Sequence, residues 1–157
     1  MIEPTINIIS PLEAAQLCRE LTAGLPDWFG IPEANQRYAK GCGEHERTTF
    51  AAKMGNDFIG MITLEFPFSN NANIYWMGVR KEHQHKNVGK QLIKTAAQYC
   101  LEKGFKSITV ETLSLKEKDP YYLNTYHFYL KCGFKPLFEL PPYGPELLMC
   151  YMQKQIA

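Results

Sequence analysis

The strongest constraint on the fold is an amphipathic helical pattern that lies between two short strand-like runs. Residues 74–79 (IYWMGV) and 107–113 (SITVETL) are rich in β-branched and aromatic residues, as strands are. Between them, residues 88–103 repeat apolar side chains at helical spacing, on one face: Leu92, Ile93, Ala96, Ala97, Cys100 and Leu101. A helix that joins two strands of one sheet makes those strands parallel. The centre of the chain is therefore predicted to be a βαβ unit.

The other strand patterns favour antiparallel pairing. They lie at residues 6–9, 48–54, 58–66, 134–140 and 147–152. Gly55-Asn56-Asp57 is typical of a hairpin turn, and the turn-rich PPYGPE joins the last two strands. The middle of the chain is thus expected to be a meander that leads into the βαβ unit.

Further helices are marked by their ends. Ser10-Pro11-Leu12-Glu13 has the serine, proline and glutamate of a helix start, and a second short helix is expected from about Pro32 to Gly41. A last helix over residues 121–132 opens at Pro120 and is closed by Gly133. Together these patterns predict an α/β fold of the α+β mixed-sheet type. Its sheet is mostly antiparallel with one parallel βαβ pair, helices flank it, and one domain spans residues 1–157.

Composition excludes several classes of protein. A chain of 157 residues with 45% apolar residues can bury a core, and its net charge of +1 is too small for a general nucleic-acid binder. Its five cysteines are dispersed and form no C-x-x-C pair, which favours a reducing cytosol. The first residues show no signal-peptide pattern, and no apolar run approaches the ~18 residues of a membrane span. We therefore expect a cytoplasmic protein with no nucleic-acid or membrane partner.

The stretch RKEHQHKNVGKQL (residues 80–92) predicts an anion site. It lies between a strand end and a helix start, where free backbone N–H groups and the helix dipole attract negative charge. Lys86 and Lys90 add positive charge. The stretch lacks the Walker A pattern, because Gln91 follows Gly89-Lys90 and Gln84 replaces the first glycine, and it lacks the dinucleotide fingerprint.

The remaining pattern, VRKEHQHKNVGKQLI, resembles the acetyl-CoA loop [QR]-x-x-G-x-[GA] of the GNAT superfamily of acyl-CoA N-acyltransferases. FYLKCGF (residues 128–134) resembles that family's second signature, Y-x-x-x-G-F, with one strand between the two signatures. LPDWFGIPEAN and YYLNTYHFY are similar to one bacterial branch of small, poorly assigned members. The resemblance covers most of the chain and implies acetyl-CoA as cosubstrate.

The resemblance implies a set of coenzyme-binding residues: Met77, Gly78, Val79, Gln84, His85, Lys86, Asn87, Val88, Gly89, Lys90 and Asn124. It implies that the Val79 N–H faces the thioester carbonyl and stabilises the oxyanion of a tetrahedral intermediate. Gly78 is expected at a bulge, or else it simply lets Trp76 pack. Asn87 stands where the family has glycine, and asparagine tolerates positive φ better than other side chains.

Three residues are candidates for proton transfer. By resemblance, Tyr129 is the general acid that protonates the leaving thiolate, the alternative being a core tyrosine. Glu65 and Glu111 are candidate general bases that free the amine, the alternative being solvated carboxylates at strand ends. Direct attack by the amine is favoured over an acyl-enzyme on Cys132, because His127 lies on another helical face.

The acceptor site is expected to include Trp28, Phe29 and Tyr143, which suit the primary amine of a small, partly apolar molecule. No metal is expected, because His83 and His85 have no further ligands at suitable spacing. The family resemblance leaves a homodimer open. Two alternatives to this enzyme also remain: a non-catalytic acyl-CoA-binding regulatory module, and a protein or peptide N-acetyltransferase.

Overall fold

One mixed sheet of seven strands runs through the protein in the order β1-β2-β3-β4-β5-β7-β6. The structure is a computed structural model that describes residues 3–157. The strands are β1 (Thr5–Ile9), β2 (Thr48–Met54), β3 (Asp57–Glu65), β4 (Asn71–Val79), β5 (Ser107–Leu113), β6 (Lys135–Leu140) and β7 (Met149–Gln155). The α-helices are α1 (Pro11–Ala23), α2 (Pro32–Cys42), α3 (Val88–Glu102) and α4 (Pro120–Lys131), and two 3-10 turns lie at Lys81–His83 and Leu115–Glu117.

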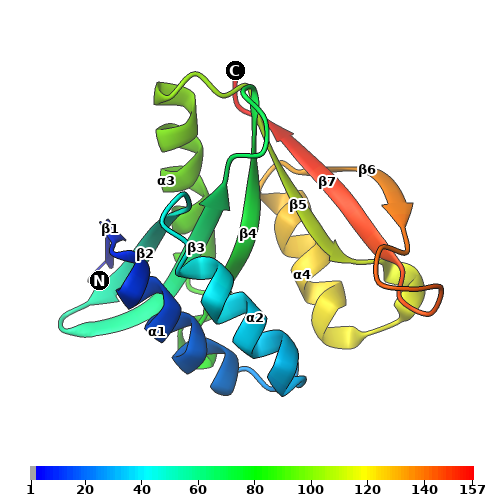
Figure 1. Ribbon diagram of the computed structural model, residues 1–157, viewed down its shortest axis with the longest axis horizontal. Helices are drawn as coiled ribbons and strands as arrows, with labels where there is room; N and C mark the ends of the chain where they lie inside the picture. Colours follow the sequence, from blue (N-terminus) through cyan, green and yellow to red (C-terminus); the bar gives the residue numbers. More distant parts are fainter. Residues whose placement is uncertain (1–2) are drawn as a thin grey trace.

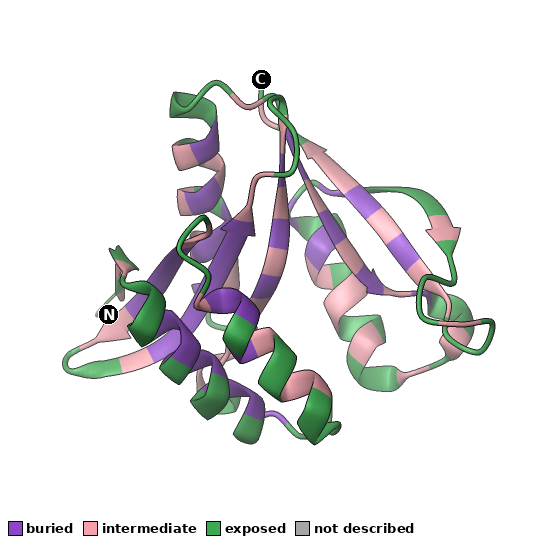
Figure 2. Ribbon diagram, viewed as in Figure 1, coloured by how far each residue is buried: buried purple, intermediate pink, exposed green. Residues whose placement is uncertain are grey.

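The predicted fold class is confirmed. β4 and β5 are parallel and joined through α3, while the other neighbouring strands pair antiparallel. Helices α1 and α2 cover one face of the sheet, and α3 and α4 lie on the opposite face (Figure 1). Buried residues concentrate in the strands and on the helix faces that look toward them (Figure 2). Two apolar cores result, one on each side of the sheet.

The helix ends follow the sequence signals. Ser10 and Glu13 form a complete capping box at the start of α1, with both hydrogen bonds at 3.1 Å. Such a cap contributes about 1 kcal/mol to helix stability. Gly104 and Gly133, just past α3 and α4, have φ of +92° and +95°, which a residue with a Cβ adopts only with strain. These two glycines turn the chain from each helix back into the next strand.

Some expectations about element ends are wrong. β4 begins at Asn71 rather than Ile74, and β7 continues to Gln155. Both extensions are polar segments that pair with the start of β5, so pairing with a neighbouring strand overrides their low strand propensity. Leu101 was expected on the buried face of α3 but is 43% exposed, because it lies in the last turn of the helix and lines a surface groove. Among the helices of residues 3–157, none is long and apolar enough to cross a membrane.

Candidate active site

The parallel strands β4 and β5 separate partway along their length. Their pairing runs only from Asn71–Ser107 to Ile74–Val110, so the last five residues of β4 have no partner on β5. We call this separation the splay, and it is visible in Figure 1 as the divergence of the two strands. A register shift opposite Thr63 and Leu64 leaves Tyr75 as an extra residue in β4, exactly where pairing with β5 ends. A bulge bends the strand that carries it, which accounts for the divergence.

Before the splay, a chain of side-chain hydrogen bonds holds the two strands together. Ser107 Oγ donates to Asn71 Oδ1 at 2.7 Å, and Asn71 Nδ2 donates to Thr109 Oγ1 at 3.0 Å. Thr109 Oγ1 in turn donates to Asn73 Oδ1 at 2.8 Å. This polar chain ends at the level where the splay begins. It therefore helps to fix the point at which the strands part.

Backbone groups of β4 face into the splay. The Arg80 N–H donates to the Ile59 carbonyl at 2.8 Å, which makes Gly60–Val79 a non-hydrogen-bonded pair of the β3–β4 ladder. The N–H and C=O of Val79 therefore point away from β3. The same alternation turns those of Met77 away from β3 as well. Because β5 has diverged here, both residues present backbone groups on the side where a strand partner is missing.

Gly78 does not lie at the bulge, and that expectation is wrong. It pairs with Met61 in regular register, and the bulge lies at Tyr75. A Cβ atom at Gly78 would lie 2.5 Å from Cη2 of Trp76, so the glycine makes room for the indole ring. The alternative interpretation of this glycine, as space for Trp76, matches the geometry.

The predicted anion-binding loop ends at α3 with an uncapped helix start. Asn87 has φ of +67° and ψ of 7°, the left-handed conformation in which the family pattern places glycine. Its side chain makes no capping hydrogen bond, whereas Ser10 and Asp119 cap α1 and α4. His85 also has a positive φ of 60°, which the sequence did not indicate. The first N–H groups of α3 are thus left without a side-chain acceptor from the cap residue.

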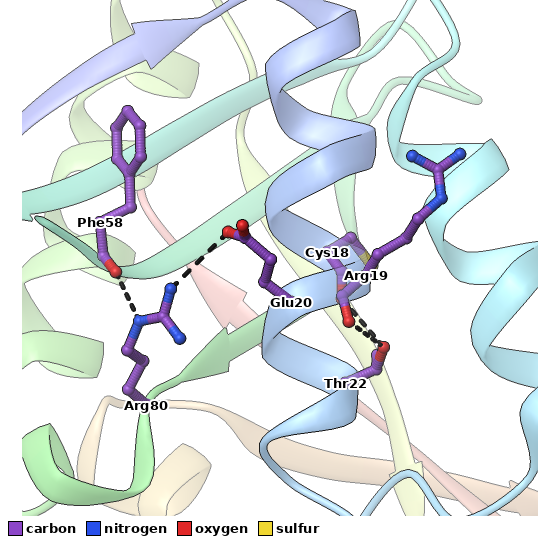
Figure 3. Close-up of polar contacts among 6 residues, drawn as sticks. All are labelled: Cys18, Arg19, Glu20, Thr22, Phe58 and Arg80. Carbon is purple, nitrogen blue, oxygen red and sulfur yellow. Dashed lines mark hydrogen bonds and ion pairs between the residues drawn. The ribbon is translucent and has the colours of Figure 1, made fainter.

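The start of the loop is anchored to the rest of the fold. Arg80 Nε donates to the carbonyl of Phe58 at 2.7 Å, and its Nη2 lies 3.7 Å from Oε2 of Glu20 on α1 (Figure 3). Gln84 Nε2 donates to the Val79 carbonyl at 3.1 Å. The Arg80 side chain therefore points away from the loop and holds the end of β4 against α1 and β3.

Two lysines flank the helix start, and further lysines line a groove along α3. Lys86 and Lys90 are exposed, and Lys90 lines a groove of about 370 Å³ between α3, the end of α4 and the end of β7. Lys94, Lys131 and Lys154 also line this groove. These three lysines are not among the residues predicted to bind the coenzyme, although the four-residue spacing of Lys90 and Lys94 on a helix was a usable signal.

The first turn of α3 packs against α4. Val88 is buried in the main core, so it presents its backbone rather than its side chain at the surface. Gly89 lies against the ring of Phe128 on α4. Asn124 is exposed and lies one turn before Phe128 on the same side of α4.

Tyr129 is buried among aromatic rings in the main core. Its ring lies 5.3 Å from that of Phe128 and 5.4 Å from that of Phe134, centroid to centroid. Burial raises the pKa of Tyr129 well above its ordinary value, so the hydroxyl stays protonated at neutral pH. Burial likewise raises the pKa of Cys132, which disfavours the thiolate that an acyl-cysteine route would need.

The two candidate carboxylates lie at different levels along the sheet. Glu65 ends β3 opposite Asn73 and accepts a 3.3 Å hydrogen bond from its Nδ2, before the splay begins. Glu111 is the first residue of β5 beyond the last pair with β4. It is half-buried and accepts a 2.6 Å hydrogen bond from the hydroxyl of Tyr143. Of the two carboxylates, Glu111 is the one at the splay.

The structure brings Tyr143 to Glu111 but gives Trp28 and Phe29 other contacts. Trp28 Nε1 donates to Thr125 Oγ1 at 3.2 Å, and Tyr122 donates back to the Trp28 carbonyl at 2.9 Å, so the α1–α2 connection is tied to α4. Phe29 packs between two rings on the α1–α2 face, those of Tyr38 and Trp76.

Two further tyrosines near Glu111 were missed by the sequence analysis. Glu111 contributes to the raised pKa of Tyr38 on α2, after burial. Burial raises the pKa of Tyr151 on β7 to about 12, and the charge of Glu111 adds to this increase. Tyr151 is the cross-strand partner of Glu111. No sequence pattern links these residues, because they come from three separate elements. Within residues 3–157, no group of three or more His, Cys, Asp or Glu side chains is placed to hold a metal ion.

Comparisons with known proteins agree with this geometry. Residues 14–134 match the sequence profile of the Acetyltransferase (GNAT) family. Comparison with curated protein sequences gives no match. A solved structure from Desulfovibrio desulfuricans, described as an acetyltransferase of the GNAT family, has a TM-score of 0.85 at 18% identity, covering 98% of this chain and 99% of that one.

Two other solved structures share the fold. The aminoglycoside 6'-N-acetyltransferase from Enterococcus faecium has a TM-score of 0.74 at 18% identity, covering 98% of this chain and 97% of that one. A GNAT family acetyltransferase from Elizabethkingia anophelis with acetyl-CoA bound has a TM-score of 0.69 at 16% identity, covering 99% of each chain. The profile spans well over half of the sequence, and the sheet, the splay and the loop before α3 lie within or beside it. This chain belongs to the Acetyltransferase (GNAT) family.

Proposed function

We propose that this protein transfers an acetyl group from acetyl-CoA to the primary amine of a small molecule. The observation that carries the proposal is the orientation of Val79. Its N–H points into the splay, eight residues before Asn87, the uncapped start of α3, which is flanked by lysines. An extended thioester arm and an attached pyrophosphate need these two features side by side.

The residues present fit coenzyme A. The first N–H groups of α3, with Lys86 and Lys90, suit the pyrophosphate, and the left-handed Asn87 lets the backbone approach it closely. Backbone groups of Met77 and Val79 can pair with the amides of the pantetheine arm, and Asn124 is placed on the same side of α4 as Phe128. Three residues shape the loop: His85 through its positive φ, Gln84 through its hydrogen bond to the Val79 carbonyl, and Gly89 through its close contact with Phe128. Bound acetyl-CoA would supply the activated thioester.

Three groups would divide the chemistry. Glu111, at the splay, takes a proton from the attacking ammonium, directly or through a water, and so frees the nitrogen lone pair. The Val79 N–H stabilises the negative charge on the carbonyl oxygen as the C–N bond forms. The Tyr129 hydroxyl donates a hydrogen bond to sulfur as the C–S bond breaks, and the departing thiolate takes up the second proton, which the nitrogen loses as the amide forms. The raised pKa of Tyr129 makes it a weak acid, so its main contribution is a hydrogen bond to the departing sulfur. Glu65 lies outside this arrangement.

The first test is calorimetric titration with acetyl-CoA, followed by thiol release over a panel of primary amines. All five cysteines are buried, so a thiol reagent should report released CoA with little background from the protein. Adenosine 3',5'-bisphosphate, which lacks the pantetheine arm, separates binding at the loop from binding at the splay. We expect acetyl-CoA to bind and at least one amine to release thiol.

The outcomes separate the alternatives. Binding without release from any free amine would overturn the proposed activity and favour a regulatory module or a peptide substrate, which a lysine peptide would then distinguish. Absence of acetyl-CoA binding would overturn the coenzyme site itself. A Glu111→Gln variant should bind acetyl-CoA normally and lose about 100-fold or more of kcat/KM. A Glu65→Gln variant is the matched control and should keep its activity.

A further inference from the structure

Glu111 lies beside tyrosines and, within residues 3–157, forms no ion pair with a lysine, arginine or histidine. It accepts a 2.6 Å hydrogen bond from the hydroxyl of Tyr143, and Tyr151 is its cross-strand neighbour. Tyr38 on α2 lies near enough for the charge of Glu111 to raise its pKa. We call these four residues the Glu111 cluster. A carboxylate with neutral aromatic neighbours and no counter-ion is suited to bind a cationic ligand, because the carboxylate and the faces of the aromatic rings both attract positive charge.

Four carboxylates of neighbouring segments are already engaged. Asp27 lies 4.0 Å from Lys81, and Glu139 pairs with Lys116 at 3.0 Å and accepts from Ser114. Two others bind backbone N–H groups. Glu117 accepts from the Leu148 N–H at 2.7 Å, and Asp119 caps α4. Glu33 and Glu146 are exposed at the surface, whereas Glu111 is half-buried and lies just beyond the last β4–β5 pair. Glu111 is therefore the carboxylate placed at the splay, where it can neutralise one positive charge of a substrate.

The rings of the cluster provide an apolar wall beside that charge. The ring centroid of Tyr38 lies 6.0 Å from that of Phe29, and Phe29 in turn packs against Trp76. The ring of Tyr151 stacks on that of Phe138 with the centroids 5.2 Å apart. Within the Glu111 cluster a polycation would meet a single carboxylate, so its further ammonium groups would lie against these rings or in solvent. An amine with an aromatic or other planar apolar body would bury that body against them.

We propose that the acceptor is a monoamine with an aromatic body, bound with its ammonium on Glu111 and its body against Tyr38, Tyr143 and Tyr151. This inference rests on the proposed function and adds its substrate class. The hydroxyl of Tyr143 occupies Glu111 in the free protein, so the incoming ammonium takes its place while the ring remains as a cation–π surface. Tyr143 is 67% exposed, which leaves it free to move.

The test compares kcat/KM for 2-phenylethylamine, spermidine and kanamycin by thiol release. We expect 2-phenylethylamine to exceed both polycations by at least about tenfold, a difference of one ion pair or stacking contact. Higher kcat/KM for spermidine or kanamycin would overturn the substrate class and leave the proposed function intact. Thiol release from no amine, despite acetyl-CoA binding, would overturn both.

A matched pair of variants tests the cluster directly. Tyr143→Ala removes the ring and should raise KM for 2-phenylethylamine about 2- to 30-fold, the range of cation–π energies. Tyr143→Phe keeps the ring and removes the competing hydroxyl, so KM should stay equal or fall. KM for acetyl-CoA should not change in either variant. Equal effects of the two substitutions on the amine KM would contradict a cation–π role.

Calorimetry without turnover gives a second measurement. Titration of 2-phenylethylamine into the complex with CoA, which carries no acetyl group, should give binding that Glu111→Gln weakens at least about tenfold. Unchanged amine binding in that variant would overturn the assignment of the ammonium to Glu111, even if Glu111 remains essential for turnover.

Discussion

Gly89, in the first turn of α3, lies directly against the ring of Phe128 on α4: a Cβ atom there would be 2.9 Å from Cζ of that ring. The start of α3 and the aromatic helix are thus packed closely because one of them carries a glycine. The second glycine of the coenzyme pattern therefore has a packing role in this protein, in addition to any approach of the backbone to a phosphate.

Gly89→Ala should lower stability and coenzyme affinity together. Overpacking typically costs about 1–3 kcal/mol, and the gain of about 1 kcal/mol in helix propensity offsets part of it. Urea unfolding and acetyl-CoA titration would measure the two effects. Adding Phe128→Leu to Gly89→Ala should recover much of the loss if the ring contact causes it, and simple additivity of the two changes would contradict this explanation.

Asn87 should tolerate glycine and resist a β-branched residue. Its φ of +67° is strained for most side chains by roughly 1–2 kcal/mol. Asn87→Gly should therefore bind acetyl-CoA at least as tightly as the original protein, and Asn87→Val should bind more weakly. Calorimetry on the three proteins gives the order, and equal affinities would show that this backbone conformation does not contribute to coenzyme binding.

Arg80 should act on the coenzyme loop from outside it. Arg80→Met removes the 2.7 Å hydrogen bond to the Phe58 carbonyl and should cost about 1–2 kcal/mol of stability, with weaker acetyl-CoA binding. Glu20→Gln is the control. The ion pair that it removes is at the surface, with N and O 3.7 Å apart, so stability should change by less than about 0.5 kcal/mol. If Glu20→Gln matched Arg80→Met, the ion pair rather than the carbonyl contact would anchor the loop.

Stability should fall at alkaline pH because several tyrosines have raised pKa values. Burial raises the pKa of Tyr151 to about 12 and also raises those of Tyr122 and Tyr129. In the unfolded chain they ionise near pH ~10. Their stabilising contribution is therefore complete below pH ~10 and is lost as the pH rises toward the folded values. Denaturant midpoints across this pH range measure the loss.

Glu111→Gln provides a specific check on that titration. It removes a negative charge beside Tyr151 and Tyr143, so the pKa of each should decrease, while that of Tyr129 should stay unchanged. Phenolate absorbance during an alkaline titration would show the shift. An unchanged titration curve would mean that Glu111 is more solvated than its contacts indicate.

Local sequence determined the elements and the loop. The amphipathic helix between two strands required the parallel pair, and the capping residues and glycines marked the helix ends, because these signals act within a few residues of one another. The conformation of Asn87 was also predictable from the sequence. The coenzyme-binding pattern needs a positive φ at this position, and asparagine adopts a positive φ more readily than other side chains do.

Only the tertiary structure decided where the strands separate and what surrounds Glu111. The bulge falls at Tyr75 rather than Gly78, because register depends on pairing with β3 and on the polar contacts that β4 makes with β5. Glu65 and Glu111 looked equivalent as carboxylates within strands, and the end of the β4–β5 pairing distinguishes them. Tyr38, Tyr143 and Tyr151 come from a helix, a connection and a strand, and only long-range packing brings them to one carboxylate.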